Sequence, residues 1–268
     1  MHNLVRQVRF SINPFLEEQT EGFNSYSAKP AGEGLAIFLA IEAELEGPID
    51  PNTGFVVNVV DIDKVVWKYV VPVFVERLQK NFQNREHIQL KRMWELLVAA
   101  SGMLTDKFAP AKLTWLRLAL NPVRKLAISS EDSQMLYFSE KFDFAASHML
   151  WNDKFSNDKN FDLFGKCANP AGHGHNYIVE VTVKKPGGDE ELKIGLFEKI
   201  VHDAFIKIVD HKNLNEDVAE FGSLNPTVEN IAAFAWKSLV GKFELSQLDS
   251  ITVWENERTF CRYTGQKR

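Results

Sequence analysis

The sequence predicts an α+β protein that contains two copies of one strand–strand–helix–helix–strand–strand unit. The main observation is an internal repeat, in which PAGEGL at residues 30–35 aligns with PAGHGH at 170–175. In both places the residues that follow alternate between apolar and other side chains, as in a strand with one buried face. Apolar residues at helical spacing run through 92–103 and recur at 228–239. The chain therefore reads as a tandem duplication.

The polar segment 129–133 is typical of a linker. We predict one domain at residues 1–128 and a second at 134–268. The two copies differ in chemistry, because five chemically distinctive residues of the second copy are replaced in the first. By the alignment His148 becomes Pro14, Cys167 becomes Ser27, His173 becomes Glu33, His175 becomes Leu35 and Glu255 becomes Arg117. The first domain is expected to keep the fold without the metal-binding side chains.

Periodicity and turn residues give the expected elements. In the first copy they are strands at 8–14, 35–41, 54–61 and 113–117, and helices at 62–81 and 92–103. In the second copy they are strands at 142–148, 175–183, 192–196, 250–255 and 258–263, a helix ending at 210–211 and a helix at 225–239. The first of these helices is expected to bury Leu196, Ile200, Ala204, Phe205 and Ile208. The last is expected to begin with Asn225 as cap and Pro226 at its first position.

Composition excludes several classes of protein. The 268 residues are 45% apolar and carry a net charge of −5, so we expect no nucleic-acid partner. We expect no export signal and no membrane span, because no apolar run approaches about 20 residues. The two cysteines, Cys167 and Cys261, are expected to be free thiols in a cytoplasmic protein.

Three histidines predict a metal site. His173 and His175 are two residues apart in a strand-like stretch and share a face with Tyr177 and Val179. His148 ends another stretch whose alternation gives it an apolar face. Three imidazoles that leave a fourth position open are typical of a catalytic Zn²⁺ site, although imidazole also suits iron and nickel.

Other reactive side chains accompany this site. Cys167 precedes His173 by six residues, so its thiol is either a base or nucleophile beside the metal or a small buried apolar side chain. Asp210 and His211 form a carboxylate–imidazole pair suited to proton transfer. Glu255 follows an apolar strand, where it would either hold a guanidine-like heterocycle by two contacts or remain a solvated edge charge.

Together these residues resemble the 6-pyruvoyl-tetrahydropterin synthase family, which includes the 6-carboxy-tetrahydropterin synthases. The resemblance covers about residues 135–265 and rests on the stretches PAGHGHNY, VDHKNLN, NPTVEN and ITVWENERTFCRYTG. It implies the tunnelling fold, an antiparallel sheet with two helices on one face that oligomerises into a barrel. For this chain it implies Zn²⁺ on His148, His173 and His175, and Cys167 as general base with Asp210 and His211 as relay. It further implies a pterin held by Glu255 with Thr227 and Glu229.

The resemblance also implies a reaction, in which 7,8-dihydroneopterin triphosphate becomes 6-pyruvoyl-tetrahydropterin with elimination of triphosphate. Formation of 6-carboxy-tetrahydropterin, cleavage to 6-hydroxymethyl-dihydropterin and a non-catalytic pterin-binding oligomer remain alternatives. Because sites of this family lie where subunits meet, we expect a homo-oligomer, either a trimer of tandem chains or a multiple of it.

Overall fold

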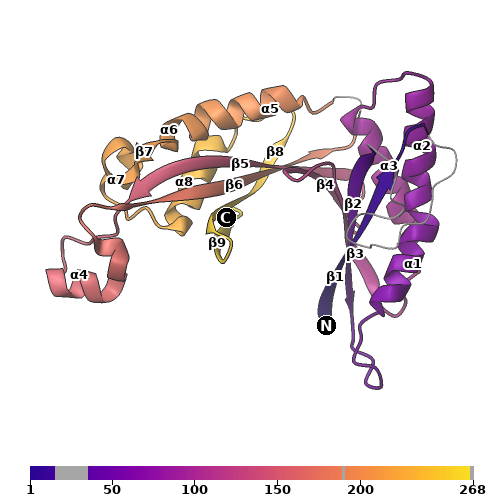
Figure 1. Ribbon diagram of the computed structural model, residues 1–268, viewed down its shortest axis with the longest axis horizontal. Coiled ribbons are helices and arrows are strands. Elements are labelled where there is room, and N and C mark those ends of the chain that lie inside the picture. Colours follow the sequence, from indigo (N-terminus) through magenta and orange to yellow (C-terminus); the bar gives the residue numbers. More distant parts are fainter. Residues whose placement is uncertain (16–35, 189–190, 266–268) are drawn as a thin grey trace. The chain divides into compact units, whose positions relative to one another are not determined.

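The computed structural model describes residues 1–15, 36–188 and 191–265. The chain forms two compact units, one of Met1–Phe138 with Pro186–Glu191 and one of Ser139–Lys185 with Leu192–Arg268. Each unit combines a largely antiparallel sheet with helices (Figure 1), so the predicted α+β class is confirmed. The repeat residues 30–35, and with them Glu33, Leu35 and Ser27, lie outside the described residues. The domain limits and the duplication stay predictions.

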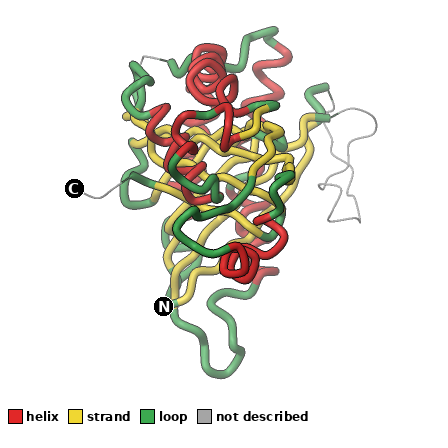
Figure 2. Tube along the Cα trace, turned by 90° about the vertical axis from the view of Figure 1, so that its left-hand side faces the viewer, coloured by secondary structure: helices red, strands yellow, loops and turns green. Residues whose placement is uncertain are grey.

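The first unit is an antiparallel sheet with helices on one side. Its strands lie in the order β1-β2-β3-β4, and Figure 1 shows the three helices together beside them. A loop at 48–58 extends past the paired ends of β1 and β2 (Figures 1 and 2). The elements are β1 (His2–Ile12), β2 (Ile37–Gly47), α1 (Val59–Tyr69), α2 (Val71–Gln83), α3 (Leu90–Leu104), β3 (Lys112–Ala119) and β4 (Arg124–Ser129).

Strict alternation builds the core of this unit. On each of β1, β2 and β3, every second side chain along part of the strand is buried. Examples with no exposed area are Phe10, Ile41 and Leu116. Phe10 meets Trp67 of α1 and Phe74 of α2, with ring centroids 6.4 and 6.1 Å apart. The expected strands at 8–14, 35–41 and 113–117 and the helix at 92–103 correspond to β1, β2, β3 and α3.

The predicted strand at 54–61 is wrong, because these residues form a loop and the first turn of α1. The Asn58 side chain caps this helix by accepting the Val60 N–H at 3.0 Å, and Asp61 lies in the first turn. The cap and the acidic residue outweigh the β-branched valines. The predicted single helix at 62–81 is also wrong in extent, since Pro72 follows a break at Val70 and starts α2.

The second unit carries its strands in the order β5-β6-β8-β9, with the two-residue β7 parallel to β5. Its helices contact one another and the sheet: Phe205 packs on Phe144 of β5 and on Phe234 of α8. The main elements are β5 (Met135–His148), α4 (Asn157–Phe164), β6 (His173–Pro186), α5 (Ile194–Val201), α6 (Lys207–Val209), β7 (Lys212–Asn213), α7 (Leu214–Asp217), α8 (Val228–Leu239), β8 (Gln247–Asn256) and β9 (Thr259–Tyr263).

Two predictions for this unit are wrong around α5. The expected strand at 192–196 does not form, because α5 already begins at Ile194. The expected apolar face is wrong in part: Phe205 is buried as expected, but Leu196 and Ile208 are exposed, and Phe197 and Val201 are buried in their place. One turn of π-helix at His202–Ile206 accounts for part of the change, because an inserted residue rotates the faces that follow.

The start of α8 also differs from the prediction. Thr227, and not Asn225, caps the helix by accepting the Asn230 N–H at 3.4 Å, and Pro226 lies before the cap. Asn225 instead accepts the Trp151 N–H at 2.9 Å. The expected buried stripe of α8, from Val228 to Leu239, is confirmed.

When α4 and β7 are left aside, the described elements of both units follow the order of two strands, a helical segment and two strands, with the same strand order in the sheet. This agreement supports the proposed duplication. None of the described helices has the length and apolar character that a membrane span requires.

The capping bond of α1 gives a test of the first unit. Replacing Asn58 by Ala removes the bond to the Val60 N–H and should lower the free energy of unfolding by about 1 kcal/mol, measured by urea titration. Asn58→Asp keeps an acceptor at the cap and should retain nearly full stability. Equal stability of Asn58→Ala and the parent chain would contradict this account of the helix start.

Candidate metal centre and active site

The three predicted histidines converge at one end of the second unit. His148 is the last residue of β5, and His173 and His175 begin β6, the next strand in the sheet. One nitrogen from each of the three rings lies within 4.8 Å of the others. His148 is buried, and the other two are half-buried.

A hydrogen bond fixes the tautomer of His148. Its Nδ1 lies 2.8 Å from the Pro226 carbonyl oxygen. A carbonyl oxygen only accepts, so Nδ1 carries the proton and Nε2 keeps its lone pair. That Nε2 lies 3.1 Å from His173 Nε2. The bond to Pro226 therefore aims the metal-binding nitrogen of His148 at its neighbour, as outer-shell partners of metal-binding histidines do.

The surroundings of His148 and His173 favour the neutral form of these two rings. Burial lowers the pKa of His148 to about 4, and the nearby His173 and His175 add to that decrease against the effect of the Pro226 bond. Burial also lowers the pKa of His173, with a further contribution from His175. Neutral imidazole is the form that binds metal ions.

The residues fit a bound transition metal. His175 Nε2 is buried without a hydrogen-bond partner, an arrangement that is rare for polar atoms. A tetrahedral ion with bonds of about 2.05 Å holds its ligands about 3.3 Å apart, close to the 3.1 Å between His148 Nε2 and His173 Nε2. A dication between these lone pairs would satisfy nitrogen atoms that otherwise face one another.

Two further side chains lie at the cluster. Glu255 Oε1 is 3.4 Å from His175 Nε2 and 3.7 Å from His148 Nε2. The Tyr177 hydroxyl is 3.5 Å from His148 Nε2, and its ring stacks on Phe144 at 4.9 Å. Burial, followed by the negative charges of Glu255 and Cys167, raises the pKa of Tyr177, so its phenol stays protonated.

Gly172 allows the two histidine-bearing strand ends to approach. It has φ +67°, and a Cβ on it would lie 3.1 Å from the His148 carbonyl oxygen. Any larger residue at this position would be strained and would also press on the backbone of His148. Gly172, the first glycine of PAGHGH, thus allows the close approach on which the geometry of the histidine cluster depends.

Cys167 lies on a short 3₁₀ turn at Gly165–Ala168, in the segment that connects β5 to β6. Its backbone carbonyl accepts the Leu150 N–H at 2.9 Å, and its thiol is free and half-buried. Its charge is the smallest of the three contributions that raise the pKa of Tyr177. Asn160, fully buried, holds this segment with bonds to Asn152 and to the backbone carbonyls of Phe155 and Ser156.

Asp210 and His211 form a pair at the edge of β5. Asp210 Oδ1 accepts the Ala145 N–H at 3.0 Å and lies 2.9 Å from His211 Nδ1. The bond from Ala145, assisted by His211, lowers the pKa of Asp210. The His211 side chain is 82% exposed. Among the described residues, no hydrogen bond or ion pair connects the pair to Cys167.

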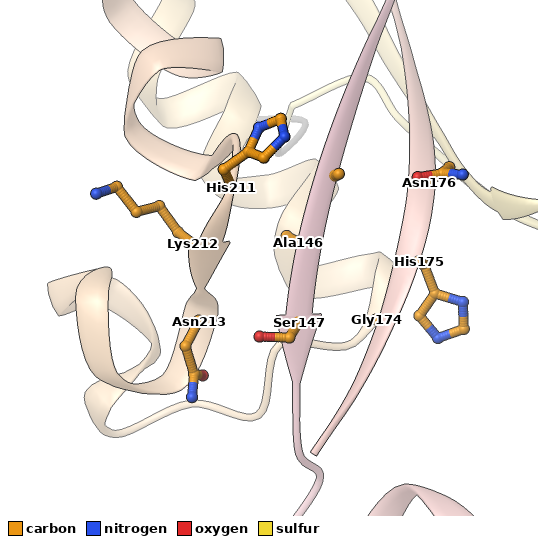
Figure 3. A pocket seen from close by; sticks show the side chains of 9 residues that line it. Ala146, Ser147, Gly174, His175, Asn176, His211, Lys212 and Asn213 are labelled. Atoms are coloured by element: carbon orange, nitrogen blue, oxygen red, sulfur yellow. The ribbon is translucent and has the colours of Figure 1, made fainter. Parts of the chain in front are cut away.

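An open cavity of 420 Å³ lies beside this pair (Figure 3). In Figure 3, β5 with Ala146 and Ser147 runs between the segment of His211 and β6, and the His175 ring points away from His211. One chain therefore gathers the three histidines and Glu255 at one place, while it presents His211 outward.

Thr227 and Glu229 lie at the start of α8. The Thr227 hydroxyl caps the helix, and Glu229 is exposed in the first turn. Burial, and then the charge of Glu229, raises the pKa of Cys261 on β9, so the carboxylate lies near that strand. Neither residue contacts the histidines through a hydrogen bond in the described part of the chain.

The comparisons with known proteins cover this second half. The sequence model of a family described as 6-pyruvoyl tetrahydropterin synthase matches residues 137–266. A human 6-pyruvoyl tetrahydrobiopterin synthase is 36% identical over 131 residues, which are 48% of this chain and 90% of that protein. The chain belongs to the 6-pyruvoyl tetrahydropterin synthase family.

Two further similar proteins have lower sequence identity to this chain. A 6-carboxy-5,6,7,8-tetrahydropterin synthase of Aquifex aeolicus is 24% identical over 156 residues, with 47% of this chain and 95% of that protein covered. A solved structure of Caenorhabditis elegans 6-pyruvoyl tetrahydropterin synthase is similar with 27% identity and a TM-score of 0.45, and it covers 49% of this chain and 96% of that one. The predicted family and the predicted lyase-type enzyme are confirmed.

Sequence reasoning missed three contributors to the site of this family member. These are the Tyr177 hydroxyl, the Pro226 carbonyl and Asn215, whose side chain bonds to both the N–H and the carbonyl of Met149. Pro226 and Asn215 lie in the NPTVEN and VDHKNLN stretches, so those motifs marked the right segments. The backbone carbonyl itself leaves no trace in the sequence.

The buried, neutral His148 predicts a dependence of stability on pH for the metal-free chain. The folded pKa lies below the unfolded value of 6.5, so the unfolded state binds the proton first and stability falls as the pH drops from 6.5 to about 4. The free energy of unfolding of the parent chain should lose about 3 kcal/mol more over this range than that of His148→Asn. Urea titrations at pH 7, 5.5 and 4 measure it, and equal losses would contradict the assignment.

Proposed function

We propose that the chain is a Zn²⁺-dependent lyase that converts 7,8-dihydroneopterin triphosphate to 6-pyruvoyl-tetrahydropterin and releases triphosphate. The observation that carries the proposal is the convergence of three imidazoles with the Glu255 carboxylate in one unit. Family membership supports the same class of reaction.

His148, His173 and His175 would hold the ion, and three protein ligands leave one position for substrate. When bound, Zn²⁺ supplies Lewis-acid polarisation of the oxygens on the substrate side chain. Zinc is the choice for three imidazoles in a site that needs no redox chemistry.

Cys167 would act as the general base, because a thiolate beside the cluster can accept a proton from the carbon next to a polarised oxygen. Asp210 and His211 would relay protons, with Asp210 orienting the imidazole through its 2.9 Å contact to Nδ1. Glu255, Thr227 and Glu229 would hold the pyrimidine edge of the pterin, whose N–H groups suit a carboxylate.

The relay pair would reach the thiol from a second copy of the chain. His211 is 82% exposed and has Asp210 as its side-chain partner, while Cys167 would serve the histidines of its own chain. A site shared between subunits would use an outward-facing histidine in this way, and a closed ring such as a trimer would repeat that contact at every interface. This arrangement also accounts for the lack of a bond between the pair and Cys167.

Formation of 6-carboxy-tetrahydropterin is a second candidate, supported by the similarity to the Aquifex synthase of that product. Cleavage to 6-hydroxymethyl-dihydropterin uses the same residues. Mass spectrometry of the product formed from 7,8-dihydroneopterin triphosphate separates the three reactions. The pyruvoyl product is the one expected.

Separate variants should distinguish the base from the metal ligands. Cys167→Ala should lower kcat by about 10²–10⁴-fold and keep one zinc per chain, because it removes a base and no ligand. His173→Ala should lose both zinc and turnover, while His87→Ala, at an exposed position, should keep both. Metal analysis and triphosphate release are the measurements. Normal turnover of Cys167→Ala would contradict the role of the thiol.

Mixing two inactive variants tests the shared site. Cys167→Ala and His211→Ala are each expected to be inactive alone. If His211 serves the thiol of a neighbouring copy, joint refolding restores intact sites in about a quarter of positions in a random ring. Recovery of triphosphate release is the expected result, and no recovery from a confirmed mixed oligomer would show that each chain completes its own site.

A further inference from the structure

The position of Glu255 does not match a residue that only holds the pterin. Its Oε1 lies 3.4 Å from His175 Nε2 and 3.7 Å from His148 Nε2. Binding of the heterocycle alone does not require a carboxylate oxygen this close to the metal-binding nitrogens. Here it points at two of the three.

An irregularity in β8 gives Glu255 this position. Trp254 pairs with Phe260 and Asn256 with Thr259 across β8 and β9, so Glu255 is an extra residue with no partner on β9. Alternation along β8 places it on the same face as Ile251 and Val253, both fully buried. Bulges of this kind redirect side chains next to active sites.

Three of the six separations among these donor atoms lie near those of a four-ligand site. A tetrahedral ion with bonds of 2.0–2.2 Å separates its ligands by roughly 3.3–3.5 Å. The measured separations are 3.1 Å between His148 and His173, 3.4 Å between His175 and Glu255, and 3.7 Å between His148 and Glu255. Three imidazole nitrogens and one carboxylate oxygen form a common ligand set for zinc and similar ions.

The charges favour the same arrangement. The Glu255 side chain is 22% exposed, and among the described residues its ion pairs are those with His148 and His175. A half-buried carboxylate without a cation is costly. A dication held by the histidines supplies the missing charge.

We propose that Glu255 is the fourth ligand of the metal in the substrate-free enzyme, and that it leaves the ion when a pterin binds. This inference rests on the proposed function and deepens it. The guanidine-like edge of a pterin offers two N–H donors to a carboxylate, so arrival of the ring exchanges one partner of Glu255 for another. The departure of Glu255 opens the fourth position only when substrate is present, which protects the ion from other ligands in the resting state.

The test uses the full chain loaded with Co²⁺, whose visible absorption reports the number and type of ligands. Glu255→Gln should change this spectrum and weaken Co²⁺ binding about 10- to 100-fold in competition with a chelator. Glu257→Gln makes the same substitution two residues away at an exposed turn and should match the parent chain. Glu255→Asp keeps the charge on a shorter side chain and serves as the second variant if Glu255→Gln folds poorly. Its Co²⁺ affinity should lie between those of the parent chain and Glu255→Gln.

Saturating neopterin, which lacks the triphosphate, should shift the parent Co²⁺ spectrum toward that of Glu255→Gln. Tight Co²⁺ binding with identical spectra and affinities in the parent and Glu255→Gln would overturn this inference and leave the three-histidine centre intact. An unchanged parent spectrum at saturating neopterin would overturn the exchange. Failure of the parent and Glu257→Gln to bind Co²⁺ would overturn the metal centre of the proposed function itself.

Discussion

The hydrogen bond from His148 Nδ1 to the Pro226 carbonyl joins the end of β5 to the segment that starts α8, and the chemistry of the second unit depends on it. It decides which nitrogen of His148 is protonated, and burial of the same ring keeps the other nitrogen available as a ligand. Gly172 then lets His173 approach the backbone of His148. The metal cluster is therefore a consequence of how a strand end, a tight turn and a helix start pack together.

The first unit has the same order of strands in its sheet, but other side chains occupy the positions that align with the site residues of the second unit. Arg117, which aligns with Glu255, forms an ion pair with Glu44 at 2.7 Å and lies over the Trp115 ring. Pro14, which aligns with His148, offers no ligand. The charge of Arg117 is thus paired within its own unit. This pairing is consistent with a role of the first unit in packing or assembly, while the reactive groups belong to the second unit.

Much of the fold and of the site could be predicted because strong local signals coincided. His148, His173 and His175 each end or begin an alternating strand, so period-two reasoning put them on one face. The strand at 54–61 failed because Asn58 caps a helix through a bond that valine-rich composition conceals. The expected buried face of this helix failed in part, because α5 buries Phe197 and Val201 in place of Leu196, and a π-helical turn at His202–Ile206 rotates the residues that follow it. The bulge at Glu255 and the Pro226 carbonyl depend on tertiary pairing, which periodicity does not encode.

The proposed reaction and the proposed role of Glu255 both depend on three imidazoles of one unit that bind a single ion. Anomalous diffraction from crystals of the zinc-loaded chain, recorded on both sides of the zinc absorption edge, tests this most directly. One strong peak per chain, bonded to Nε2 of His148 and to nitrogens of His173 and His175, is the predicted result. Density with no zinc peak at this cluster, or with His148 turned away from the other two rings, would contradict it.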